Sequence, residues 1–292
     1  MSAVAAGLHQ LRALTLSVRR VDASFRGFIS HLALVVFVIL TIYPIFFLFN
    51  VSAKSRFQFE RNPLSLEPPE GIYAYVLAWE LVSRSMLNTF VITLASLAGL
   101  IVTASITAYV FARYSFPGRD LLFSGLLVLL MIPGILTIVP LLVLVSQMKL
   151  VNTLWAAILP YIAGGQAFNI FIMRTFFASL PEELFESARL DGAGHLDLIF
   201  RLVMPLSAPI LVVVGILHVL NSWNDIAWPL LVLNDIRVRT VALQLLQFQS
   251  PFQEYPTAAF AGSVIASVPL LVIFLLGMRQ FVNGVITGAL KL

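Results

Sequence analysis

Residues Glu182–Pro209 read EELFESARLDGAGHLDLIFRLVMPLSAP, a charged stretch that lies between two long apolar runs. The pattern predicts two short helices, at about 180–190 and 196–202. Asp191-Gly192 separates them, because glycine adopts backbone turns that other residues resist. Connections between packed helices usually take about 2–8 residues. A polar loop longer than this indicates a surface in water that a soluble partner binds.

The rest of the chain has the composition of a membrane protein. Of its 292 residues, 60% are hydrophobic and 11% are charged, against roughly 45–50% and about 25% in ordinary soluble domains. A helix of about 20 apolar residues crosses the hydrocarbon core of a bilayer. Six stretches without Asp, Glu, Lys or Arg are each long enough: Gly27–Ala53, Ser85–Ala112, Leu121–Met148, Leu150–Met173, Leu202–Asn224 and Tyr255–Met278. We therefore expect an all-α membrane protein with six transmembrane helices.

These runs predict one membrane domain flanked by two tails. A basic tail is expected at 1–28, a six-helix transmembrane domain at 29–282 with a helical loop at 179–206, and a second tail at 283–292. Residues 51–85 are expected to form the longest loop on the opposite side, with a short helix at about 72–81. The predicted spans are 29–50, 86–111, 121–146, 153–177, 206–231 and 258–281.

The distribution of basic residues predicts the orientation in the membrane. Cytoplasmic segments of membrane proteins are enriched in Lys and Arg. With the N-terminus inside, the cytoplasmic side carries the larger number of them, including Arg12, Arg19, Arg113 and Arg201. Both termini and the 182–209 loop are therefore expected to be cytoplasmic.

The six spans carry few ionisable side chains. Charged groups within a membrane are costly and usually mark proton relays or ion pathways. The candidates are His31, His218 and Asp225, and His218 is expected to bond a neighbouring helix rather than a ligand. This disfavours an ion-coupled secondary carrier, and the spans also lack the paired carboxylates or HExxH of a membrane-embedded enzyme. The chain has no GxxxxGK[ST] phosphate loop, so ATP-driven transport would need an ATPase on another subunit.

The 182–209 loop resembles the cytoplasmic EAA loop of ABC-importer permeases. Further segments resemble the carbohydrate branch of that family, in particular the second permease subunit of the maltose importer, over about residues 85–290. Ser187 and Asp225 depart from the family pattern, which usually has alanine and glutamate there. The matching segments are Glu186-Ser187-Ala188, Asp191-Gly192-Ala193 and Met204-Pro205 in the loop, Tyr109–Arg113 with Phe116–Arg119, Asn221–Asp225 with Trp228-Pro229, and Asn283–Val285 with Thr287–Lys291.

The resemblance implies the fold of a type I ABC importer permease, a multi-pass protein of the bacterial inner membrane. Its complex would contain a second permease subunit, two ATPase subunits and an extracytoplasmic solute-binding protein. This chain would be a transport subunit rather than an enzyme, with no cofactor of its own, while ATP and Mg²⁺ would be bound by the partner ATPase. ATPase closure would drive alternating access. The cargo would be a sugar or oligosaccharide, with alginate oligosaccharide as one candidate, and a permease for another solute class is the alternative.

The resemblance also implies that the ATPase docks on the loop. The residues expected to couple the two subunits are Glu186, Ser187, Ala188, Asp191, Gly192, Ala193 and Pro205. The alternative is a solvated helical hairpin that only connects two spans.

A polar and aromatic segment at the end of the fifth span is the candidate substrate pathway. Asn221, Asn224, Asp225 and Trp228 are spaced i, i+3, i+4 and i+7, which places them on one face of a continuous helix. Amides and carboxylates bind sugar hydroxyls, and amides facing lipid would be left unpaired at a cost. This face is therefore expected to line the pathway, with Trp223 pointing toward lipid or the partner subunit. The alternative is an interfacial tryptophan belt.

Overall fold

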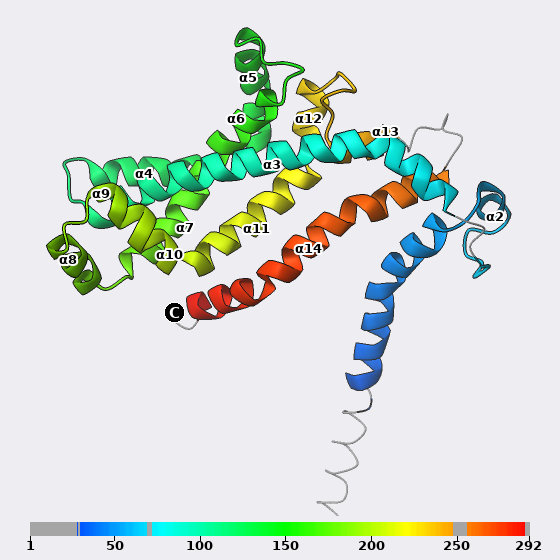
Figure 1. The fold of residues 1–292 in the computed structure, drawn as a ribbon, viewed down its shortest axis with the longest axis horizontal. Coiled ribbons are helices and arrows are strands. Elements are labelled where there is room, and N and C mark those ends of the chain that lie inside the picture. The colour runs from blue at the N-terminus through cyan, green and yellow to red at the C-terminus, as the bar shows by residue number, and fades with distance from the viewer. Residues whose placement is uncertain (1–27, 29, 69–71, 248–255, 290–292) are drawn as a thin grey trace, which may run out of the picture.

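The computed structural model describes residue 28 and residues 30–68, 72–247 and 256–289. Within these ranges every regular element is helical, which confirms the predicted all-α fold class (Figure 1). The elements are a first helix Ser30–Ser52, α2 Arg56–Arg61, α3 Tyr73–Arg113, α4 Arg119–Leu129, α5 Gly134–Gln147, α6 Trp155–Gly164, α7 Gln166–Ala178, α8 Glu182–Leu190, α9 His195–Asp197, the π-helical turn η1 Leu198–Val203, α10 Met204–Leu206, α11 Ala208–Asn224, α12 Ala227–Val232, α13 Val241–Gln247 and α14 Pro256–Ala289.

Three helices are individually long and apolar enough to cross a membrane: the first helix, α3 and α14. Three further pairs qualify when taken together, although each pair is bent. The bend is 97° between α4 and α5, 45° between α6 and α7, and 80° between the segment His195–Leu206 and α11. If each bent pair is one span, the described chain has up to six spans, the number that the sequence predicts.

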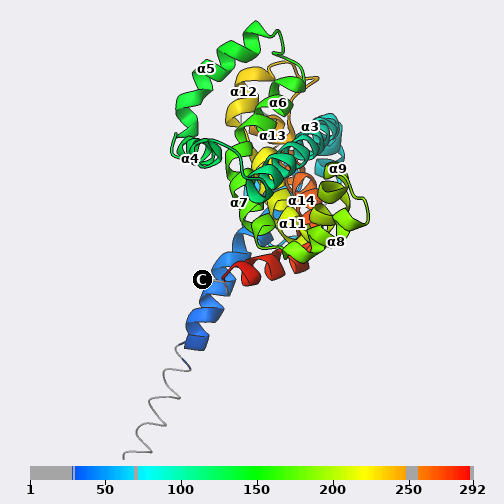
Figure 2. The same ribbon diagram turned by 90° about the vertical axis from the view of Figure 1, so that its left-hand side faces the viewer.

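Helix α3 is the axis of the molecule and contacts α6, α7, α11, α13 and α14 (Figures 1 and 2). The sequence predicted a span at 86–111 and a separate short helix at 72–81, but the two are one helix of 41 residues. At 1.5 Å per residue this helix is about 60 Å long. The extension forms because Ala74, Ala78 and Val82 are buried in one cluster with residues of α13 and α14. Tertiary packing thus continues the helix through charged Arg84.

Three of the predicted spans are interrupted. The span at 121–146 breaks before Pro133, which precedes α5 and supplies no N–H for a continuous helix. The span at 153–177 bends at Gly164-Gly165, where a Cβ on Gly165 would lie 3.0 Å from Leu100 Cδ1. The close packing of the Leu100 side chain from α3 against this position therefore favours a glycine. The span at 206–231 ends at Asn224 and is followed by the separate helix α12.

The last helix extends beyond the predicted end of the sixth span. Helix α14 runs to Ala289, so most of the predicted tail at 283–292 continues the last helix. Residues 1–27 of the predicted N-terminal tail lie outside the described part. The first helix diverges from the other helices (Figures 1 and 2), and none of its most apolar window is buried within this chain.

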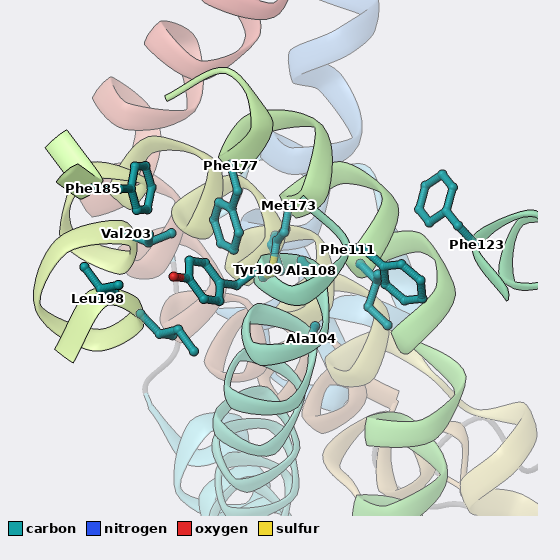
Figure 3. Close-up of a cluster of buried hydrophobic side chains, with 13 residues drawn as sticks. Ala104, Ala108, Tyr109, Phe111, Phe123, Met173, Phe177, Phe185, Leu198 and Val203 are labelled. Atoms are coloured by element: carbon teal, nitrogen blue, oxygen red, sulfur yellow. The ribbon is translucent and has the colours of Figure 1, made fainter. Parts of the chain in front are cut away.

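The buried side chains form three clusters along the bundle. The cluster around Tyr109, Phe177 and Phe185 joins α3, α7, α8 and η1 (Figure 3). It lies at the end of the bundle that carries α8 and α9, which we call the α8 end. The opposite end carries α2 and is called the α2 end (Figure 1).

Candidate functional site

The predicted coupling loop forms two helical segments at the α8 end. The first, α8, agrees closely with the predicted helix at 180–190. The second was predicted at 196–202, but α9, η1 and α10 together run over His195–Leu206, up to the 80° bend before α11. The π-helical turn in this segment is irregular backbone that residue spacing alone does not reveal.

Gly192 makes the turn between these segments. Its φ is +83°, a left-handed conformation that glycine adopts at little cost. The N–H of Gly192 donates to Arg189 O at 3.0 Å, and the N–H of Ala193 donates to Ala188 O at 2.9 Å. This pair of bonds is a Schellman motif, which satisfies carbonyls left free at the end of a helix. No atom lies within 4 Å of a Cβ built on Gly192, so the backbone conformation, not space, requires the glycine.

Helix α8 has a buried face and an open face. Phe185 is fully buried, and its ring stacks on Tyr109 with centroids 6.4 Å apart (Figure 3). Leu190 is 89% exposed, and Leu196 is 65% exposed on the following segment. Of the residues predicted to couple the ATPase, Ala188 and Ala193 are half-buried, while the others are exposed: Glu186, Ser187, Asp191, Gly192 and Pro205. The open face thus combines acidic side chains with exposed leucines, a surface suited to a protein partner.

An open groove of about 820 Å³ lies between α6, α7 and α11. Its polar lining comes from all three helices and includes hydroxyl, amide, imidazole and carboxylate groups. Asn221, near the end of α11, is exposed to this groove, and its side chain makes no hydrogen bond to another described residue. The polar lining residues are Tyr161, Asn169, His218, Asn221, Ser222, Asn224 and Asp225.

Asp225 connects two walls of this groove. Its Oδ2 accepts a hydrogen bond from the Tyr161 hydroxyl of α6 at 2.8 Å. Its Oδ1 accepts from the N–H of Ala227 at 2.9 Å, at the start of α12. Short polar side chains commonly satisfy the free N–H groups where a helix begins. Asp225 therefore ends α11, starts α12 and fixes Tyr161 at the groove.

The two tryptophans occupy positions opposite to those predicted. Trp228 does not share a face with Asn221 and Asn224, because α11 ends before it. Instead Trp228 is buried, and its Nε1 donates to Ala156 O at 2.9 Å. Trp223, expected to face lipid or a partner, is 2% exposed and packs edge-to-face on Phe90. The geometric prediction was right for the two asparagines and wrong for both tryptophans.

His218 bonds a neighbouring helix as the sequence predicted. Its Nε2 lies 2.8 Å from Ser96 Oγ on α3. The sequence reasoning missed Tyr161 and Asn169, which complete the groove from α6 and α7. A signal for Asn169 was present, since a lone amide within an apolar run needs a polar partner or a cavity.

Comparisons with known proteins agree with this architecture. Residues 101–286 match the family described as binding-protein-dependent transport system inner membrane component. The chain is 32% identical over 262 residues to an arabinooligosaccharides transport system permease protein, AraQ, from Halalkalibacterium halodurans, covering 86% of this chain and 92% of that protein. It is 28% identical over 271 residues to the sn-glycerol-3-phosphate transport system permease protein UgpE of Rhizobium meliloti, covering 88% and 95%.

A solved structure has the same fold. It is the crystal structure of a bacterial ABC transporter involved in the import of the acidic polysaccharide alginate. One of its chains superposes with a TM-score of 0.79 at 20% identity, covering 87% of this chain and 96% of that one. At this identity the likeness establishes the fold alone. The family match spans more than half of the chain, and the chain therefore belongs to the family of binding-protein-dependent transport system inner membrane components, the permeases of ABC transporters.

Proposed function

We propose that this chain is a permease subunit of an ATP-driven importer for a sugar or oligosaccharide. The main support for this proposal is the groove between α6, α7 and α11. It presents amide and hydroxyl groups beside apolar side chains, in a bundle that is otherwise apolar. Such groups bind sugar hydroxyls by directed hydrogen bonds. Relatives whose names specify arabinooligosaccharides and diacetylchitobiose support this solute class.

The proposed complex contains a second permease subunit, two ATPase subunits and an extracytoplasmic solute-binding protein. ATP and Mg²⁺ belong to the ATPase subunits in this proposal, and closure of those subunits drives alternating access. The α8 end takes the ATPase, because α8 presents an exposed acidic and apolar face there. The groove faces the second permease, since one side of it is open in this chain.

Purification of the complex and a solute panel test the function. The chain is expected to copurify with an ATPase subunit, and ATP hydrolysis in vesicles should rise when the solute-binding protein carries its sugar. The panel consists of an arabino-oligosaccharide, diacetylchitobiose, an alginate oligosaccharide and sn-glycerol-3-phosphate. Stimulation by a saccharide supports the proposal. Stimulation by glycerol phosphate alone would favour another solute class, and transport driven by an ion gradient without an ATPase would reject the proposal.

The orientation gives a second prediction. In the bacterial inner membrane, both termini and α8 should lie on the cytoplasmic side. The chain contains no cysteine, so single cysteines report position without background. An impermeant thiol reagent applied to spheroplasts should label Leu64→Cys, at a side chain that is 61% exposed, and should not label Ser187→Cys. Inside-out vesicles serve as the control and should give the reverse pattern. Labelling of position 187 in intact spheroplasts would refute the orientation.

A further inference from the structure

Arg113, the last residue of α3, joins three structural elements with one side chain. Its Nη1 donates to Glu182 Oε2 at 2.7 Å, at the start of α8. Its Nη2 donates to Phe177 O at 2.8 Å and to Leu180 O at 2.6 Å, where α7 ends. These carbonyls lie at a helix end, where backbone acceptors lack helical partners and a cation is favoured. The side chain is only 9% exposed, so solvent screens these contacts little.

The same guanidinium also contacts the buried face of α8. The Cζ of Arg113 lies 3.9 Å from the centre of the Phe185 ring. Phe185 is the residue that inserts α8 into the core next to Tyr109. A cation held over an aromatic ring in a desolvated site is attracted more strongly than at an exposed one. Arg113 thus holds α8 both at its first residue and at its buried anchor.

Few side chains other than arginine can make this set of contacts. The guanidinium presents a planar fork of donors that reaches several acceptors at once and stacks on a ring. Lysine offers a compact charge without that fork. The ion pair with Glu182 contributes little by itself, because Glu182 is 51% exposed. The two part-buried carbonyl bonds hold the guanidinium at the end of α7, and the attachment of α8 itself depends mainly on the ring contact with Phe185.

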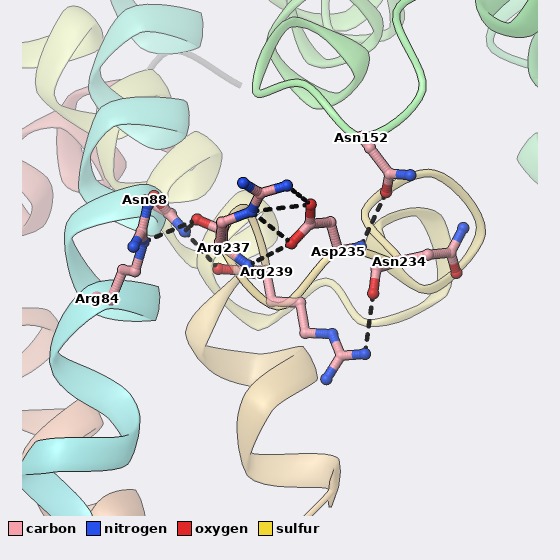
Figure 4. Close-up of polar contacts among 7 residues, drawn as sticks. All are labelled: Arg84, Asn88, Asn152, Asn234, Asp235, Arg237 and Arg239. Carbon is pink, nitrogen blue, oxygen red and sulfur yellow. Dashed lines mark hydrogen bonds and ion pairs between the residues drawn. The ribbon is translucent and has the colours of Figure 1, made fainter.

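The N-terminal half of α3 is attached to the segment 237–241, which follows α12 in the chain (Figure 4). Arg84 Nε donates to Arg237 O at 3.1 Å. Asn88 Nδ2 donates to Arg237 O and to Arg239 O, each at 3.0 Å. The buried Thr89 hydroxyl accepts from Val241 N at 2.8 Å. One face of α3 therefore holds this segment by backbone contacts at several points.

Further contacts stabilise the segment 237–241 and the residues just before it. Hydrogen bonds from Arg237 lower the pKa of Asp235 to about 2, so that this carboxylate stays ionised at physiological pH. Asp235 N donates to Asn152 Oδ1 at 2.9 Å, which ties the segment to the turn before α6 (Figure 4). A movement of α3 along its axis would therefore displace the segment 237–241 as a structured unit.

We propose that Arg113 is a positioning residue that fixes α8 to α3, so that a displacement of α8 passes along α3 to the segment 237–241. The inference rests on the proposed function, because it takes α8 as the surface that an ATPase moves. A continuous hydrogen-bonded helix of 41 residues is a rigid element suited to this link. Arg113 supplies the attachment at the C-terminal end of α3, and Arg84 with Asn88 supplies it in the N-terminal half.

The test uses the complete complex in vesicles, with the panel solute that stimulates hydrolysis in the wild type. Arg113→Met keeps the volume and removes the fork. It should leave assembly and basal hydrolysis in place and reduce solute-stimulated hydrolysis about tenfold, the equivalent of losing hydrogen bonds to a charged group. Arg113→Lys should restore part of the stimulation. Asn88→Ala, in the N-terminal half of α3, should lower stimulation in the same way without affecting ATPase binding.

Arg119→Met is the matched control. Arg119 is the first residue of α4, its Nε bonds the exposed carboxylate of Asp120, and it has no contact with α8 among those described. This variant should keep its stimulation. Normal stimulation in Arg113→Met or in Asn88→Ala would overturn the proposed link. If the Arg113→Met complex fails to assemble, the Arg113→Lys complex serves as the test. Full stimulation in that variant would overturn the proposed link. Absence of stimulation in the wild type would instead reject the proposed function.

Discussion

Gly192→Pro is expected to abolish transport and solute-stimulated ATP hydrolysis together, while the chain still inserts into the membrane. Gly192 has a φ of +83°, whereas proline fixes φ near −65° and removes the N–H. That N–H bonds Arg189 O, so the substitution breaks the Schellman motif as well as the turn. The cost is about 3 kcal/mol or more if the motif must rearrange. The α8 face would then be presented to the ATPase at the wrong angle.

Graded substitutions separate the conformation of the turn from its sequence. Asparagine tolerates the left-handed region better than other residues with side chains, so Gly192→Asn should keep most of the activity. Gly192→Ala should have intermediate activity. Its Cβ would meet no other atom, but the left-handed backbone conformation still costs alanine about 1–2 kcal/mol. ATPase copurification and hydrolysis in vesicles measure the series. A fully expressed Gly192→Pro complex with normal stimulated hydrolysis would show that the loop is only a connector.

Glu186→Lys distinguishes docking from folding. Glu186 is exposed on α8, and no ion pair or side-chain hydrogen bond joins it to another described residue. Reversing its charge should therefore change α8 itself very little. A loss of ATPase copurification in Glu186→Lys, with the permease still inserted, is expected if the exposed face of α8 meets the ATPase.

The geometry of the α8 end could be read from the sequence because its determinants are local. A glycine between two charged segments requires a turn, and the residues around it are near neighbours in the chain. The existence of α8 and its bounds therefore followed from spacing alone. In the sequence, Arg113 is one of the basic residues that predict the orientation and part of a family motif, and neither pattern indicates its contacts. Its role in holding α8 depends on residues 64 and 69 positions away, and no pattern of spacing reveals a contact at that separation.

The substrate groove was predictable only in part, for a related reason. The prediction for Trp228 assumed that one helix continues through Asp225. Aspartate is a common residue at the start of a helix, so Asp225 was itself a signal that a new helix begins there. The burial of Trp223 depends on Phe90 of α3, a contact across the bundle. Asn221 and Asn224 precede the break, and their shared face was therefore predicted correctly.

Asn221→Leu and Asn224→Leu are expected to impair solute uptake while the complex assembles and keeps its basal hydrolysis. Both asparagines line the groove, and leucine has the same number and branching of side-chain heavy atoms without the amide. The Asn224 amide nitrogen already donates to Leu220 O at 2.8 Å, which leaves its oxygen for a solute. Asn221 has both amide atoms available, so its loss should have the larger effect. Each variant should lower uptake about two- to tenfold, the equivalent of a net hydrogen bond of about 0.5–1.5 kcal/mol.

Two comparisons decide whether the effect belongs to the groove. Asn234→Leu makes the same chemical change in the loop after α12, outside the groove, and should transport normally. Tyr161→Phe removes the hydroxyl that bonds Asp225 while keeping the ring, and should reduce uptake with little loss of assembly. If Asn221→Leu and Asn224→Leu both transport normally, or fail only because the subunits do not assemble, this face packs against a partner. The polar end of α11 would then belong to the membrane interface, and the solute would pass along another wall.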